Sequence, residues 1–102
     1  APRAEILCEI GHMLLAKNAC RAAAYWYSQA LTAGPQEDSG GFVQDDCHRY
    51  IPYMQLCVCF DRLGDHKKAY EYHLLAKGVK PEAEAVRQNQ AYFDTLFEKE
   101  NL

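Results

Sequence analysis

The most informative absence in this 102-residue sequence is that of a long apolar segment. No apolar run approaches the roughly 18 residues that a membrane-spanning helix requires, so we expect no membrane span. Basic residues are not in excess either. The formal net charge is −3, whereas a nucleic-acid-binding domain needs a basic face, so nucleic acid is not an expected partner. The first residues, Ala1-Pro2-Arg3, have no initiator Met and no signal-peptide pattern, which favours a domain cut from a longer protein.

The sequence also lacks the even cysteine count that is typical of a disulfide scaffold. Its five cysteines fall mostly on predicted helix faces, which indicates reduced thiols in a cytoplasmic protein. Hydrophobic residues make up 49% and charged residues 25%, ordinary values for a globular chain. At this length we expect one domain with a modest core.

A pattern of residues that occurs twice organises the chain. Each copy has bulky, aliphatic and small residues at helical spacing, then two alanines that flank an aromatic residue or His, and a closing Pro. The first copy consists of Leu7, Ile10, Gly11, Leu14, Ala23, Tyr27, Ala30 and Pro35, and the second of Tyr53, Leu56, Cys57, Phe60, Ala69, His73, Ala76 and Pro81. This spacing predicts two helix-turn-helix units, with the small residues where two helices approach closely.

The pattern resembles the tetratricopeptide repeat, whose period is about 34 residues. The resemblance implies an all-α fold, a tetratricopeptide-like α-α superhelix of two helix-turn-helix repeats plus a C-terminal capping helix. We expect repeat one at about 4–35, an insertion at about 36–49, repeat two at about 50–81 and the capping helix at about 82–99. The polar residues Arg87, Gln90 and Asp94 replace apolar ones in that last helix, which is typical of a solvent-facing cap.

Local signals predict where the helices of the second half begin and end. Gly64 can adopt a left-handed conformation, and Asp65 after it is a good N-cap. Gly78 is expected to stop the helix that begins at His66. Pro81 and Glu82 are both favourable in a first turn, so the last helix should begin at one of them.

The segment 36–49 interrupts the repeat period and is acidic, with two adjacent glycines. Insertions of this kind often carry the binding function of a repeat protein. The candidate binding residues here are Phe42, Asp45, Asp46 and His48, which would meet a sugar or a basic partner. The alternative is a solvated loop, with Asp46 placed near the dipole of the following helix.

A narrower resemblance covers residues 37–43, 46–47, 50–65 and 89–93. These stretches are similar to the repeat region that follows the catalytic domain in bacterial family 2 glycosyltransferases of the repeat-containing type. The resemblance implies an accessory module that recognises acceptors, packs on the catalytic domain of its parent chain or forms a homodimer. The sugar-nucleotide site of such enzymes lies in a domain that these residues do not match, so we expect this chain to be non-catalytic and to need no cofactor.

The first helix of each repeat is expected to line a concave groove. The candidate groove residues are Glu5, Cys8, His12, Met54, Val58, Asp61, Arg62, Gln88 and Tyr92. They predict a semi-polar groove for a peptide or helix, with Met54 and Tyr92 as apolar anchors. A free-standing adaptor that binds a partner in this groove is therefore the alternative to the glycosyltransferase accessory domain.

A metal site or a reactive thiol is less favoured. Cys57 and Cys59 are two positions apart, so on a helix they point about 200° apart and cannot easily share a zinc ion. Cys8 and His12 are one turn apart, but no further pair of ligands is evident. We therefore predict no metal site and no catalytic residue.

Overall fold

The computed structural model describes residues 3–33 and 46–100, apart from the side chains of Asp46 and Cys47. Within these ranges the chain is entirely helical, with turns and no strand. The five α-helices are α1 (Ala4–Ala16), α2 (Cys20–Ala33), α3 (Ile51–Arg62), α4 (His66–Val79) and α5 (Glu84–Glu100), and a single π-helical turn, Asp46–Tyr50, leads into α3.

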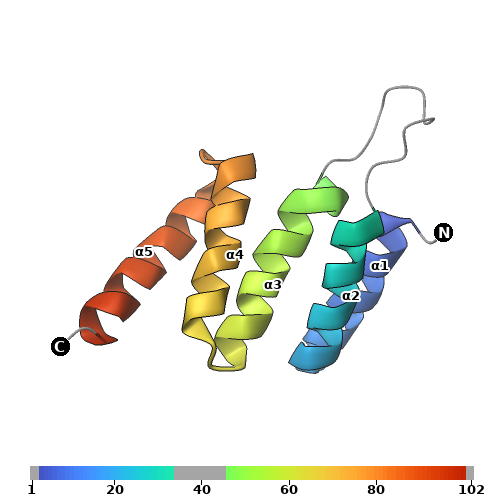
Figure 1. Cartoon of the computed structure of the whole chain (residues 1–102), viewed down its shortest axis with the longest axis horizontal. Coiled ribbons are helices and arrows are strands. Elements are labelled where there is room, and N and C mark those ends of the chain that lie inside the picture. Colours follow the sequence, from blue (N-terminus) through green and yellow to red (C-terminus); the bar gives the residue numbers. More distant parts are fainter. Residues whose placement is uncertain (1–2, 34–45, 101–102) are drawn as a thin grey trace.

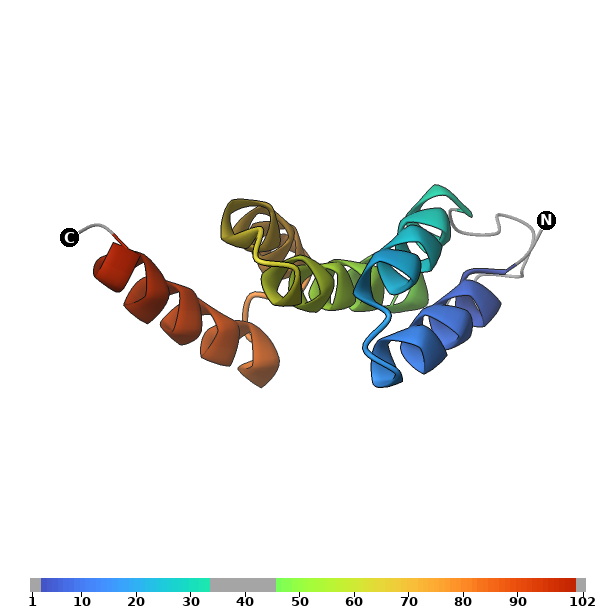
Figure 2. The ribbon, with the colours of Figure 1, turned by 90° about the horizontal axis from the view of Figure 1, so that it is seen from below.

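The five helices form one row in chain order, with each helix packed against the next (Figure 1). The row measures 51 × 29 × 18 Å. Seen from below, α2 and α4 lie on one side of α3, and α1 and most of α5 lie on the other (Figure 2). The all-helical architecture and its two helical hairpins, α1–α2 and α3–α4, agree with the fold class expected from the repeated pattern.

Close approach of α1 and α2 depends on the small residue of the first repeat. The ring of Tyr27 on α2 is only 1% exposed and lies against the backbone of Gly11 on α1. A Cβ atom at Gly11 would stand 2.8 Å from that ring, closer than real Cβ atoms come to any neighbour. Ala23 and Ala30, on the same helix as Tyr27, are fully buried. The prediction that Gly11 and Ala23 let the two helices approach closely is confirmed.

The core consists of two clusters. The first joins buried residues of α1 and α2 to Leu56 and Cys59 of α3, both 0% exposed, so it holds the two hairpins together. The second surrounds Phe93 of α5, which is 1% exposed and lies edge-on to Tyr70 of α4 with ring centroids 5.3 Å apart. Helix α5 is therefore attached through an aromatic cluster.

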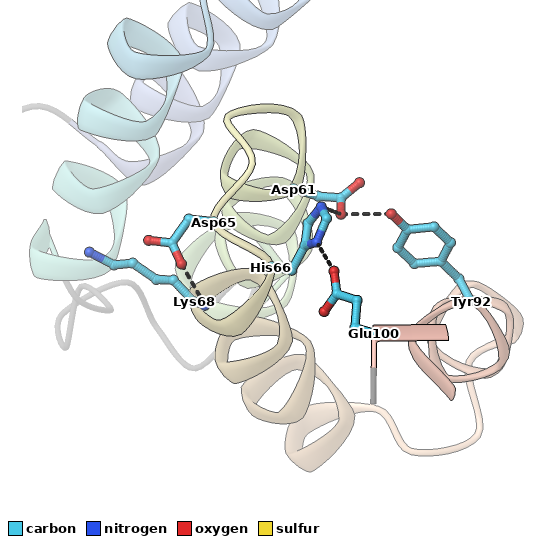
Figure 3. Close-up of polar contacts among 6 residues, drawn as sticks. All are labelled: Asp61, Asp65, His66, Lys68, Tyr92 and Glu100. Carbon is cyan, nitrogen blue, oxygen red and sulfur yellow. Dashed lines mark hydrogen bonds and ion pairs between the residues drawn. The ribbon is translucent and has the colours of Figure 1, made fainter. Parts of the chain in front are cut away.

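The connections inside both hairpins follow local backbone chemistry. Asn18, between α1 and α2, has a φ of 61°, and Gly64, between α3 and α4, has a φ of 88°. Asn and Gly are the residues that adopt this left-handed conformation most easily. Asp65 then caps α4, since its Oδ1 accepts a hydrogen bond from the Lys68 backbone N–H at 3.1 Å (Figure 3). The turn predicted at Gly64-Asp65 is confirmed.

Two predicted boundaries are wrong. Helix α4 continues through Gly78 to Val79, because a glycine in a helix costs only about 1 kcal/mol and does not end it by itself. Helix α5 begins at Glu84, because a turn in which the Ala83 N–H donates to the Lys80 carbonyl holds Pro81 before the helix. The last residues of the expected insertion, from Asp46 onward, form the π-helical turn that leads into α3.

The outer surface of α5 is polar, as expected for its sequence. Arg87 and Asp94 are exposed. Gln90 links this surface to the interior, because its Nε2 donates to Asp94 at 2.9 Å and its Oε1 lies 2.9 Å from Nε2 of the fully buried His73. In the part of the chain that the structure describes, no helix is both long and apolar enough to cross a bilayer.

Candidate binding site between α3 and α5

An open pocket of about 230 Å³ lies between α3 and α5. Its lining consists of Cys57, Val58, Asp61, Arg62, Asn89, Tyr92 and Phe93. Four of these, Val58, Asp61, Arg62 and Tyr92, are among the residues that the repeat pattern placed in the groove. The structure therefore brings together four of the six predicted groove residues of the second half of the chain, while Met54 and Gln88 are not part of the lining.

A polar network along one edge of this pocket connects α5 to α3 and α4 (Figure 3). The Tyr92 hydroxyl donates to Asp61 Oδ1 at 2.7 Å. His66, the first residue of α4, lies between two carboxylates, with its Nε2 3.7 Å from Asp61 Oδ1 and its Nδ1 2.9 Å from Glu100 Oε1. The network thus holds α5 at two places, near its middle through Tyr92 and at its end through Glu100.

The hydrogen bond between Tyr92 and Asp61 predicts how Tyr92 titrates. The Asp61 carboxylate holds the hydroxyl proton of Tyr92. This bond raises the pKa of Tyr92 to about 12, together with partial burial and the nearby negative charge. Because the folded pKa lies above the ordinary value of 10.0, the stabilisation should be complete below about pH 10 and lost as the pH rises toward 12. Tyrosine-resolved NMR titration should show that Asp61→Asn lowers this pKa.

The matched control is Tyr92→Phe, which identifies the Tyr92 resonance by its loss. Tyr27 also titrates late, because burial raises the pKa of Tyr27 to about 12, and it should be unaffected by Asp61→Asn. An unchanged Tyr92 titration in Asp61→Asn would show that the hydrogen bond is not formed in solution.

Arg62 connects the pocket to the first repeat. Its Nη1 donates to the Leu15 carbonyl at 3.4 Å and to Asn18 Oδ1 at 3.5 Å, both at the C-terminal end of α1. The Leu15 carbonyl also accepts a hydrogen bond from the Asn18 backbone N–H at 2.8 Å, and a cation at this end of a helix complements the helix dipole. Arg62 therefore holds α1 in place as well as lining the pocket.

Asn89 is a pocket residue that the sequence pattern did not identify. Its Nδ2 lies 3.7 Å from Met54 Sδ, so it joins α5 to a predicted groove residue of α3. The groove prediction named its neighbour Gln88 instead, which is exposed and outside the pocket lining. His66 and Glu100 were also missed, because 34 residues separate them and neither belongs to the repeated pattern.

The predicted groove residues of α1 do not reach this pocket. Glu5 and His12 are exposed on α1. The prediction for Cys8 is wrong, because its side chain is only 7% exposed and belongs to the core cluster shared with α2. On α1 the core face is therefore wider than the repeat pattern indicated.

The candidate residues of the insertion fall into two groups. Phe42, Asp45 and the side chain of Asp46 lie outside the described residues. His48 is 7% exposed, and its Nδ1 has no hydrogen-bond partner within the described ranges. The prediction that His48 is presented to a ligand is therefore wrong, because the π-helical turn buries it instead.

The thiols near the pocket are not activated. Burial raises the pKa of Cys57 to about 12 and that of Cys59 to about 11, so both are protonated at neutral pH. A nucleophilic cysteine needs the opposite shift. Across residues 3–33 and 46–100, no three His, Cys, Asp or Glu side chains come close enough to hold a metal ion. What the site offers is an apolar pocket with a polar edge.

No protein-family model, curated protein or solved structure matches the chain. The resemblances to the tetratricopeptide repeat and to the glycosyltransferase repeat region therefore stay predictions from the sequence.

Proposed function

We propose that this chain is a tetratricopeptide-type interaction module whose pocket between α3 and α5 binds an apolar side chain of a protein or peptide partner. The observation that supports this most is the pocket itself, because residues predicted independently from the repeat pattern line it together.

The apolar part of the pocket suits one side chain. Val58 is half-buried, while Cys57 and Phe93 are held in the core at 3% and 1% exposure. A cavity of about 150 Å³ is large enough for benzene. The 230 Å³ found here is thus sufficient for a Leu, Met or Phe side chain. Tyr92, 45% exposed, offers a flat ring at the rim.

The polar part of the pocket favours a ligand in which a basic or hydrogen-bond-donating residue lies next to the apolar one. Asp61 uses Oδ1 for Tyr92 and His66, and no described residue donates to its Oδ2. A peptide with an apolar residue next to Lys or Arg would fill the pocket and place its cation against the Asp61 carboxylate.

The test is selection from a random peptide library displayed on phage against the 102-residue chain. Selected peptides should share an apolar residue beside a basic one. Val58→Glu puts a charge into the pocket and should weaken their binding at least about tenfold, or roughly 1.4 kcal/mol. Gln88→Glu adds the same charge on α5 outside the pocket lining and should change affinity less than about twofold.

Two results would contradict the proposal. One is a library that yields no binder to the folded chain. The other is a set of binders whose affinity for Val58→Glu equals that for the parent sequence, with circular dichroism showing that both are folded.

A further inference from the structure

Helix α1 carries an apolar stripe on the side that faces away from the rest of the molecule. Ile6 is 51% and Met13 61% exposed, and Ile10 between them is half-buried. These three residues follow the i, i+4, i+7 spacing of one helix face. Helix α1 is at one end of the row of helices, opposite α5 (Figure 2). We call Ile6, Ile10 and Met13 the end stripe.

The same face is covered by a helix in the second repeat. Moving each member of the end stripe forward by the repeat offset gives Pro52, Leu56 and Cys59 on α3. All three are fully buried, and Leu56 and Cys59 belong to the core cluster that α2 shares. The face of α3 that corresponds to the end stripe of α1 is therefore covered by another helix, α2.

Helix α2 covers the equivalent face of α3, so its residues indicate what kind of helix would fit the end stripe. On α2, the residues buried in the same cluster as Leu56 and Cys59 include the small residues Cys20 and Ala24, one turn apart. Small residues allow the close approach that a flat apolar stripe requires. As consecutive helices of the row, α2 and α3 are antiparallel (Figure 1).

Charge at the two ends of the stripe adds a second constraint. Arg3 precedes α1 at its N-cap position and Lys17 follows α1 at its C-cap, and both are exposed. Neither has an ion-pair partner among residues 3–33 and 46–100. A cation at the N-terminal end of a helix is unfavourable because of the helix dipole, so Arg3 has no stabilising role there within the helix itself. A carboxylate from outside would compensate it.

We propose that the end stripe docks an amphipathic α-helix of a protein partner, antiparallel to α1. That helix carries small and aliphatic residues at i, i+4 and i+7 toward the stripe. A carboxylate at each end of its apolar face pairs with Arg3 and Lys17. This site is on a different face from the pocket between α3 and α5 and does not depend on the function proposed for it.

The experiment uses a hydrocarbon-stapled helical peptide of about four turns. It presents Ala, Leu and Leu toward the stripe and Glu in its first and last turns. Fluorescence anisotropy with the whole 102-residue chain should give saturable binding with a Kd on the order of 100 μM or tighter. Met13→Asp, at an exposed position that should not affect folding, should weaken binding at least about tenfold.

A charge exchange distinguishes this site from non-specific association. A peptide with Lys in place of both Glu residues should bind the parent chain about tenfold more weakly, and the double variant Arg3→Glu/Lys17→Glu should restore its affinity. Val58→Glu, in the pocket between α3 and α5, is the matched control and should bind the stapled peptide like the parent chain.

Three results would overturn the proposal. The first is no saturation up to about 1 mM of a peptide that circular dichroism shows to be helical. The second is binding that Met13→Asp leaves unchanged. The third is a dimer of the chain in sedimentation that Met13→Asp dissociates, since a second copy would then be the occupant of the stripe.

Discussion

Replacement of Phe93 by Ala should lower the free energy of unfolding by about 3–5 kcal/mol. Phe93 is 1% exposed, and its ring centroid lies 5.3 Å from that of Tyr70 and 5.8 Å from that of Phe97. Its removal would leave a cavity in the middle of the cluster that attaches α5. Because α5 packs mainly on α4 and follows it at the end of the row, little else can take over this attachment.

Urea unfolding followed by circular dichroism measures this effect. The matched control is Tyr92→Phe on the same helix, which keeps the ring and removes only the hydrogen bond to Asp61. That change should cost no more than about 3 kcal/mol, the upper range for a hydrogen bond to a charged group, and less than this because Tyr92 is 45% exposed. A loss of under about 1 kcal/mol for Phe93→Ala would mean that α5 is not docked on α4 in solution.

Substitution of Gly11 by Ala should destabilise the chain by about 1–3 kcal/mol, although it adds only one methyl group. The new Cβ would stand 2.8 Å from the Tyr27 ring, which is 1% exposed and closely surrounded. Helix propensity alone would predict the opposite, because Ala stabilises a helix interior by roughly 0.5–1 kcal/mol relative to Gly. The sign of the measured effect therefore decides whether the contact between α1 and α2 exists.

Gly78 provides the comparison. It also lies within a helix, its φ is not in the left-handed region, and a Cβ there would meet nothing within 4 Å. Gly78→Ala should raise stability by up to about 1 kcal/mol in the same urea experiment. If Gly11→Ala raised the urea midpoint, as Gly78→Ala should, the close approach at Gly11 would be refuted.

The repeated spacing in the sequence was sufficient to predict the helices and their close contacts. Gly11 against Tyr27 and the Asp65 cap both depend on rules that act over one or two turns of helix or between adjacent helices. Helix ends were less predictable, since Gly78 and Pro81 have local preferences that neighbouring hydrogen bonds can override. Propensity decides a helix end only where packing and hydrogen bonding are neutral.

The candidate pocket could be predicted only in part. The pattern identified Val58 and Tyr92, since both occupy the face of a helix that the repeat leaves open. It could not identify the partners of long polar side chains. Arg62 reaches Leu15, 47 residues earlier in the chain, and His66 meets Glu100. Helical periodicity gives the direction of a side chain but not the neighbour that it meets in space. Cys8 was misplaced for the same reason, whereas His48 was expected in a loop and is buried by the π-helical turn.

The attachment of α5 also has a consequence for the order in which the helices pack during folding. Within residues 3–33 and 46–100, helix α5 joins the row through contacts with α3 and α4, such as Tyr92 with Asp61 and Asn89 with Met54, which lie 31 and 35 residues apart in the chain. Such contacts close longer loops than the turns inside the hairpins do, so we expect α5 to dock after each hairpin has formed. Cys57 is 3% exposed, lines the pocket and packs in the same cluster as Phe93. The rate at which a thiol reagent modifies Cys57 should therefore report how often this cluster opens.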